Sequence, residues 1–155
     1  MATLSVTIGK NVKTIVTNIF LNSKKLSTVT IPSENNYFIE DKKVLYSKSK
    51  DVLYSYFHTK SDETFTIPDS VKIIEWRAFS KNPYLKEVTI PASVEQIRTN
   101  AFHSASKLEK VTFLGKKNPR VCNTNAFYGI ASNSVIYVPS DYEGDTLCGV
   151  TVTKK

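Results

Sequence analysis

The sequence predicts a repeat solenoid of the α/β type, with short parallel strands stacked on one side and short helical or 3-10 turns opposite them. Two observations predict it. Residues 67–89 and 90–112 align without a gap at a spacing of 23 residues. Residues 6–31 carry the same apolar positions as residues 88–113, 82 residues earlier in the chain. A fixed spacing of this length indicates a solenoid, because each unit buries its apolar side chains only against its neighbours.

Each unit begins with a short strand. Val88 and Ile90 lie two residues apart, so their side chains point the same way, and Pro91 ends the strand because it has no backbone donor. On the far side of the unit, Ala101 and Phe102 are expected to begin a short helical turn, with the phenyl ring wedged between neighbouring coils. Stacked units would then form one parallel sheet.

The pattern IPxSVxxIxxxAFxxxxxLxxVxIP, present at residues 67–91, resembles the leucine-rich repeat of the BspA-like surface-protein family. Residues 42–71 resemble the variant unit inserted in such proteins, and residues 132–152 resemble the terminal unit of trichomonad and amoebic members. The resemblance implies a leucine-rich-repeat fold with its strands on a concave face. It also implies a role in adhesion and recognition at a cell surface, with extracellular-matrix or host proteins as ligands, and no catalytic residues.

The chain is expected to form a single domain, 1–155, with regular repeats at 6–31 and 65–113, an irregular unit at 32–64 and a capping unit at 114–150. The first repeat has no polar cap before it, although solenoid ends usually carry one. We therefore expect either further repeats upstream or self-association through the N-terminal edge.

One inserted β-hairpin is expected within the irregular unit. Ile31 and Ile67 are 36 residues apart, 13 more than one repeat. Residues 44–47 and 52–57 read as two strands joined by a turn at 48–51. Tyrosine beside a basic residue is typical of binding hot spots. The candidate ligand-binding residues here are Tyr46, Tyr54, Tyr56, Lys48 and Lys50. The alternative is that the aromatic rings pack the hairpin onto neighbouring coils.

A second candidate surface is the side of the strands that points away from the core. One strand position is held by Thr7, Thr30, Thr66, Thr89, Thr112 and Tyr137, and the position two residues earlier includes Glu87 and Lys110. The candidate ligand-binding residues on this expected concave face are Thr66, Glu87, Thr89, Lys110, Thr112 and Tyr137. The alternative is structural, because threonine is a favoured strand residue that stacks well on itself.

The residues predict no enzyme. The five glycines form no phosphate-binding loop, and no cluster of histidine, cysteine and carboxylate side chains predicts a metal site, so no cofactor is expected. The two cysteines, Cys122 and Cys148, are too few for a disulfide scaffold. One bridge between them and two free thiols are both open interpretations.

The net charge of +7 favours acidic partners. The densest basic run is Lys107, Lys110, Lys116, Lys117 and Arg120, for which a solvated surface is the alternative. A protein partner is expected, with sulfated glycans as a second candidate. A nucleic-acid partner is not expected. Membrane insertion is not expected either, because no apolar stretch reaches about 18 residues.

The location has two interpretations. The family resemblance implies a cell-surface or secreted protein, of which this chain would be a part. The alternating apolar and polar residues at the N-terminus are unlike a signal peptide, which favours a cytoplasmic interaction scaffold instead.

Overall fold

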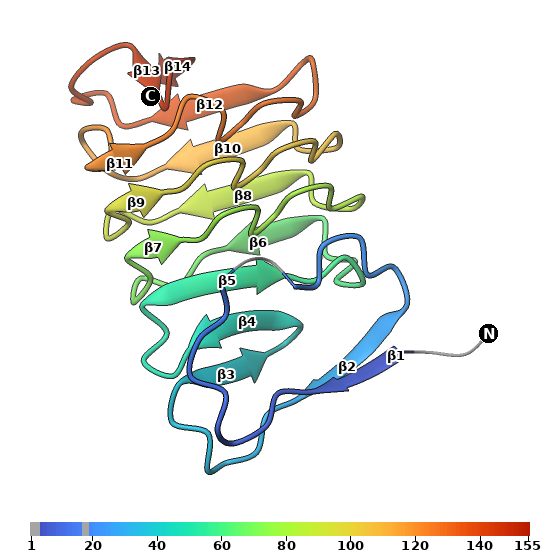
Figure 1. Ribbon diagram of the computed structural model, residues 1–155. Helices are drawn as coiled ribbons and strands as arrows, with labels where there is room; N and C mark the ends of the chain where they lie inside the picture. Colours follow the sequence, from blue (N-terminus) through green and yellow to red (C-terminus); the bar gives the residue numbers. More distant parts are fainter. Residues whose placement is uncertain (1–3, 17–18) are drawn as a thin grey trace.

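The computed structural model of the chain describes residues 4–16 and 19–155, and the described residues form strands joined by turns (Figure 1). The strands are β1 (Leu4–Thr7), β2 (Leu26–Thr30), β3 (Phe38–Asp41), β4 (Val44–Ser47), β5 (Val52–Tyr56), β6 (Thr64–Thr66), β7 (Ile73–Ile74), β8 (Glu87–Ile90), β9 (Gln96–Ile97), β10 (Lys110–Phe113), β11 (Val121–Cys122), β12 (Val135–Val138), β13 (Thr146–Leu147) and β14 (Val150–Lys154). The part of the first repeat at 17–18 lies outside the described residues.

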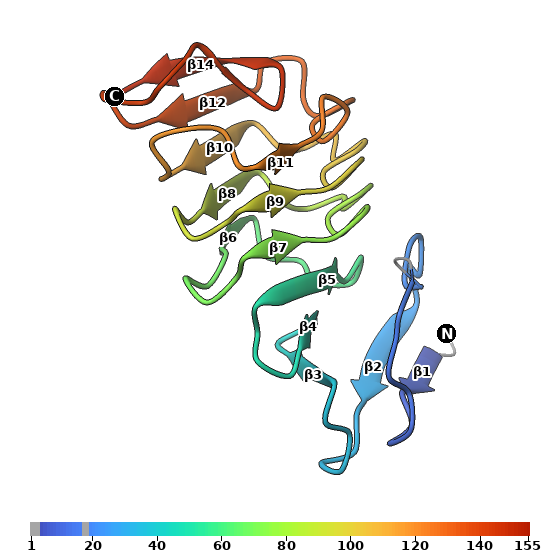
Figure 2. The same ribbon diagram turned by 60° about the vertical axis from the view of Figure 1, so that its left-hand side comes forward.

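Two six-stranded sheets contain the strands from β3 onward, and a third, two-stranded sheet lies at the N-terminal end. The first, which we call the long sheet, has the order β13-β14-β12-β10-β8-β6. The second has the order β11-β9-β7-β5-β4-β3, and β1 pairs with β2 alone. Figures 1 and 2 show the coils that carry β6 to β11 stacked along one axis, each contributing one strand to each of the two larger sheets.

The spacing of 23 residues is confirmed by the strand register. In the long sheet Val88 lies beside Val111, and in the second sheet Ile74 lies beside Ile97. Both pairs are parallel and both are 23 residues apart. The apolar side chains predicted to point inward are buried between the two sheets, where Val88, Val111, Ile74 and Ile97 are at most 1% exposed.

A column of phenylalanine rings fills the far side of the coils. The rings of Phe79 and Phe102 stack with centroids 4.7 Å apart, and those of Phe102 and Phe127 with centroids 5.0 Å apart, each pair 11° from parallel. Aromatic pairs at such distances add to the burial of their area. The predicted wedging of the aromatic ring between coils is therefore confirmed.

The predicted helical turns are wrong, because the described residues contain no helix. The backbone N–H of Phe79 donates to the carbonyl of Ala101 in the next coil at 2.7 Å, and that of Phe102 donates to the carbonyl of Ala126 at 2.8 Å. Arg77 and Asn100 also adopt left-handed φ values of 57° and 59°, which a right-handed helix excludes. The backbone N–H groups of these turns thus donate alternately to the next coil and to a residue three positions earlier in the same turn, as Ala78 does to Glu75 at 3.1 Å.

The predicted hairpin is confirmed, and the structure extends it to three strands. β4 pairs antiparallel with β5, and β3, which the sequence did not predict, pairs antiparallel with β4. β5 then continues the second sheet by pairing in parallel with β7. We refer to β3, β4 and β5 as the meander.

The meander separates the first repeat from the rest of the solenoid (Figure 2). Successive side chains of a strand point to opposite faces. Leu45 therefore packs with the β1–β2 unit in one buried cluster, while Val44 and Tyr46 pack in the main core. As a result β2 does not pair with β6, and the predicted threonine column is interrupted between Thr30 and Thr66.

The other end of the long sheet carries a small antiparallel turn-back. β14 pairs in parallel with β12, and β13 pairs antiparallel with β14. A disulfide joins Cys122 to Cys148 with their Cα atoms 4.7 Å apart, linking β11 to the segment between β13 and β14. The two cysteines are 26 residues apart in the sequence. A bridge closing a loop of this length stabilises a fold by about 3 kcal/mol.

Candidate functional site

The hairpin candidates are divided between the two buried clusters. Tyr46 and Tyr56 are 3% and 2% exposed and lie in the main core, where burial raises the pKa of both phenols above the usual range. Lys50 lies over the Tyr46 ring, with its ammonium 5.7 Å from the ring centroid, and forms an ion pair with Asp41 at 2.6 Å. Lys50 therefore links Asp41 of β3 to Tyr46 of β4. The buried Tyr46 and Tyr56 rings pack the meander onto the core.

The remaining two hairpin candidates lie on the N-terminal side of the meander. Tyr54 is partly buried and packs edge-on against Phe38 with ring centroids 5.4 Å apart, and burial raises the pKa of its phenol. Lys48 is exposed and lines a hollow of about 420 Å³ together with Thr30 and Pro32. The five hairpin residues therefore do not converge on a single surface.

The second candidate surface is continuous over the long sheet. Thr66, Thr89, Thr112 and Tyr137 lie side by side on β6, β8, β10 and β12, and Thr153 of β14 extends the row. Neighbouring strands in a sheet lie about 4.8 Å apart. All of these side chains are exposed or half-buried. We call this row and the row two residues earlier, Thr64, Glu87, Lys110 and Val135, the outer face of the long sheet.

Glu87 and Lys110 bind each other on the outer face. A carboxylate oxygen of Glu87 accepts a hydrogen bond from the Lys110 ammonium at 2.9 Å. This hydrogen bond raises the pKa of Lys110 above its usual value. The two charges that the sequence singled out are therefore a compensated pair, with Thr64 and Val135 on either side of it.

Tyr137 lies next to Thr153, near the end of the outer face that is closest to the C-terminus. The ammonium of Lys155 lies over its ring, 3.1 Å from the centroid. Beside the ring is a hollow of about 170 Å³ lined by residues that include Thr112, Leu114 and Pro139. Leu114 is 47% exposed. The sequence did not predict the parts of Leu114 and Lys155, since Leu114 follows its strand and Lys155 follows the last repeat unit.

The predicted basic run is partly compensated. Lys110 pairs with Glu87, and Lys116 forms an ion pair with Asp141 at 2.6 Å. Lys117 and Arg120 are exposed and line a hollow of about 540 Å³ that also contains Glu95 and Glu143. Carboxylates in and around this hollow reduce its attraction for an anion.

Other kinds of site find no support in the residues that the structure describes. Across 4–16 and 19–155, no three histidine, cysteine or carboxylate side chains gather where they would hold a metal ion. In the same part of the chain, no helix has the length and apolar character that crossing a membrane requires.

The family is shown by the sequence itself. The model of the BspA-type leucine-rich-repeat region matches residues 2–52 and 50–144, in six copies. The chain belongs to this BspA-type leucine-rich-repeat family. No curated protein matches the chain in sequence.

Two solved structures share this leucine-rich-repeat fold. A leucine-rich repeat protein from Eubacterium ventriosum is 25% identical with a TM-score of 0.62, over 87% of this chain and 41% of that one. The pneumococcal vaccine antigen PcpA is 20% identical with a TM-score of 0.55, over 91% of this chain and 47% of that one. The chain thus spans less than half the length of either protein. Both are bacterial, and the affinity to protist members stays a prediction.

The BspA-type repeat indicates a protein-interaction module. The family consists of repeat proteins that bind partners and is not a known enzyme family. Of the two candidate surfaces, only the outer face of the long sheet holds its predicted residues side by side among the described residues.

Proposed function

We propose that this BspA-type module recognises a matrix or host protein at a cell surface through the outer face of the long sheet. The observation that carries the proposal is the row of Thr66, Thr89, Thr112 and Tyr137, held in register across four parallel strands. These positions face away from the core, so a partner reaches several of them at once.

The chemistry of the row suits a protein partner. Threonine is stiff at χ1, so ordering it on binding costs little entropy, and it offers both a methyl group and a hydroxyl. Tyr137, beside the hollow that Leu114 borders, supplies an aromatic anchor of the kind that dominates binding hot spots. The Glu87–Lys110 pair adds a dipole that orients a partner without leaving a net charge.

A surface or secreted location is part of the proposal. The disulfide between Cys122 and Cys148 supports it, because disulfides persist in oxidising environments outside the cytosol. Mass spectrometry of the native protein under alkylating conditions tests this point. Fully alkylated, unbridged cysteines would contradict a surface location.

Binding to a panel of purified extracellular-matrix proteins at physiological salt tests the proposed function. Thr112→Arg and Tyr137→Ala change the outer face, and we expect each to weaken binding about tenfold or more, as the loss of a hot-spot contact does. Thr30→Arg is the matched control, since Thr30 is an exposed strand threonine of the separate β1–β2 sheet. Binding that survives both outer-face changes, or that Thr30→Arg weakens equally, would contradict the proposal.

A further inference from the structure

A pocket lies on the turn side of the solenoid, away from the outer face. Its volume is about 630 Å³, and its lining includes Asn22, Lys24, His58, Lys81, Tyr84 and Ser104. Pockets of about 300–1,000 Å³ hold small-molecule ligands. We call it the coil-edge pocket.

The repeat itself brings these side chains together. Asn22, Lys81 and Ser104 occupy one repeat position, since they are separated by the same 82 and 23 residues as the apolar positions. Lys24 and Ser106, also in the lining, occupy the position two residues later. The pocket is therefore an edge shared by three coils, closed on one side by the segment that leaves the meander.

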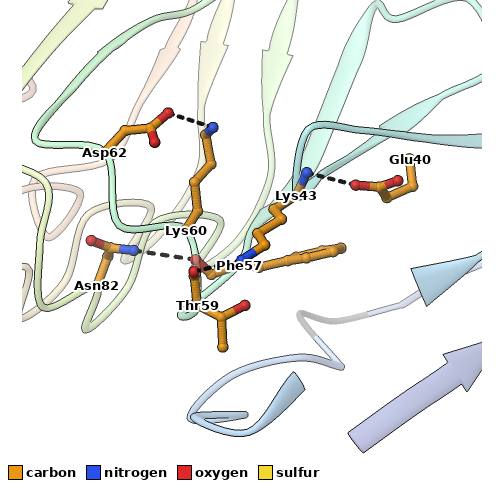
Figure 3. A network of polar contacts seen from close by, with 7 residues as sticks. All are labelled: Glu40, Lys43, Phe57, Thr59, Lys60, Asp62 and Asn82. Atoms are coloured by element: carbon orange, nitrogen blue, oxygen red, sulfur yellow. Dashed lines mark hydrogen bonds and ion pairs between the residues drawn. The ribbon is translucent and has the colours of Figure 1, made fainter. Parts of the chain in front are cut away.

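That segment is fixed in place before any ligand binds (Figure 3). The Asn82 amide donates to the carbonyl of Phe57 at 3.3 Å, and the Lys43 ammonium donates to the carbonyl of Thr59 at 3.0 Å. The Thr59 hydroxyl donates to the carbonyl of Leu26 at 2.6 Å, which ties the segment to the first repeat. A site held in this way loses little entropy on binding.

The pocket gathers positive charge that is not compensated. Among the described residues, neither Lys24 nor Lys81 forms an ion pair. The His58 side chain, 6% exposed, hydrogen-bonds the backbone of Lys81. Burial lowers the pKa of His58, and the two lysine charges lower it further. Lys24 and Lys81 both line this one pocket, so their ammonium groups can act on one bound anion.

Three residues that line the pocket adopt a backbone conformation that favours glycine, although none of them is glycine. Asn22, Lys81 and Ser104 have left-handed φ values of 63°, 57° and 56°. In the next coil the corresponding residue is Gly129, with φ 73°. Hydrogen bonds between coils, such as Lys81 N–H to the His103 carbonyl at 2.9 Å, account for the backbone conformation but not for the side chains. A ligand contact would account for the side chains.

We propose that the coil-edge pocket binds an acidic saccharide, one that carries sulfate or carboxylate groups. The ammonium groups of Lys24 and Lys81 would bind the anionic group through charge-assisted hydrogen bonds. The Ser106 and Ser104 hydroxyls and the Asn22 amide have both donors and acceptors, as sugar hydroxyls do, and the Thr59 hydroxyl, which donates to Leu26, can still accept. Tyr84, 45% exposed at the rim, presents an aromatic face to the apolar side of a sugar ring.

Calorimetric titration of the full chain with a sulfated heparin tetrasaccharide at physiological salt tests this site. The double variant Lys24→Ala, Lys81→Gly removes both cations, and glycine suits the left-handed φ at 81. We expect affinity to fall at least about tenfold, since charge-assisted bonds are lost. The control Lys117→Ala, Arg120→Ala removes the same charge from another surface and should change affinity less than about twofold. Thermal melting checks that every variant folds.

Three outcomes would overturn the proposal. An equal loss in both double variants would mean that only the net charge binds the tetrasaccharide. Equal affinity for a tetrasaccharide that is fully desulfated, N-acetylated and carboxyl-reduced, and so carries no charge, would exclude recognition of the anionic groups. Tighter binding of a hexaglutamate peptide, lost in Lys24→Ala, Lys81→Gly, would assign the pocket to an acidic protein segment instead. None of these outcomes bears on the outer face, whose matrix-protein test uses different residues.

Discussion

Glu87 and Lys110 hold each other across neighbouring strands of the long sheet, with 2.9 Å between carboxylate oxygen and ammonium nitrogen. Because they are directly opposed, Glu87→Lys would set two like charges side by side and should lower the melting temperature. The exchange Glu87→Lys, Lys110→Glu restores the attraction and should restore the melting temperature, while leaving binding to the matrix-protein partner impaired. If the exchange restored binding as well, the direction of the pair would play no part in recognition.

The aromatic column should be the main source of cohesion between coils. Phe102 is fully buried and stacks on both Phe79 and Phe127. We expect Phe102→Ala to lower the free energy of unfolding by about 3–5 kcal/mol, from lost burial and the cavity left behind. Urea denaturation measures this. Tyr128→Ala, at a side chain that is 67% exposed, should cost less than about 1 kcal/mol. Similar losses in the two variants would contradict the role of the column.

Two tyrosine-to-phenylalanine changes should have opposite signs. The Tyr56 hydroxyl is buried and has no hydrogen-bond partner among the described residues. The Tyr142 hydroxyl donates to the carbonyl of Thr146 at 2.9 Å. Because an unsatisfied buried hydroxyl is costly, Tyr56→Phe should raise the free energy of unfolding by about 1 kcal/mol, and Tyr142→Phe should lower it by about as much. A destabilised Tyr56→Phe would show that this hydroxyl has a partner in solution.

Acidification should lower the stability of the folded chain through protonation of His58. Burial lowers the pKa of this histidine in the folded chain, and Lys24 and Lys81 add to the effect. Its contribution to stability is therefore fully present above the unfolded value of about 6.5 and is lost as pH falls through the lower folded pKa. Thermal melting between neutral and acidic pH should show this loss for the wild type and a smaller one for His58→Asn. Identical profiles would place the pH response elsewhere, and His103→Asn, at a half-buried side chain, controls for loss of a histidine.

Most of the fold could be predicted from the repeat period. Spacing and apolar positions predicted the parallel strands, their register and the stacked phenylalanine rings, because these depend on side-chain direction alone. The prediction of helical turns was wrong because alternate backbone N–H groups of residues 77–81 donate to the next coil, and the local sequence pattern does not distinguish such a turn from a helix. The separation of β2 from β6 was not foreseen either, since it depends on both faces of the meander being buried.

The candidate surfaces were predicted less completely. The outer face followed from alternation along each strand, so Thr66, Thr89, Thr112 and Tyr137 were found in register. Tyr46 and Tyr56 are of a residue type typical of hot spots, but they lie in the core. The sequence did not show this, because the third strand of the meander was not predicted. One part of the coil-edge pocket could have been found in the sequence, because Lys81 and Ser104 occupy equivalent repeat positions. That His58 closes the pocket could not, because this depends on the three-dimensional path of the chain.

The central claim is that a matrix or host protein binds the outer face of the long sheet. Its most direct test is an NMR titration of threonine methyl groups with the matrix protein that binds tightest in the panel. We predict that the methyl signals of Thr66, Thr89 and Thr112 shift or broaden, while those of Thr28 and Thr30 on the separate β1–β2 sheet do not. Perturbation of Thr28 and Thr30, or of Thr59 in the coil-edge pocket, with the long-sheet threonines unchanged, would contradict it.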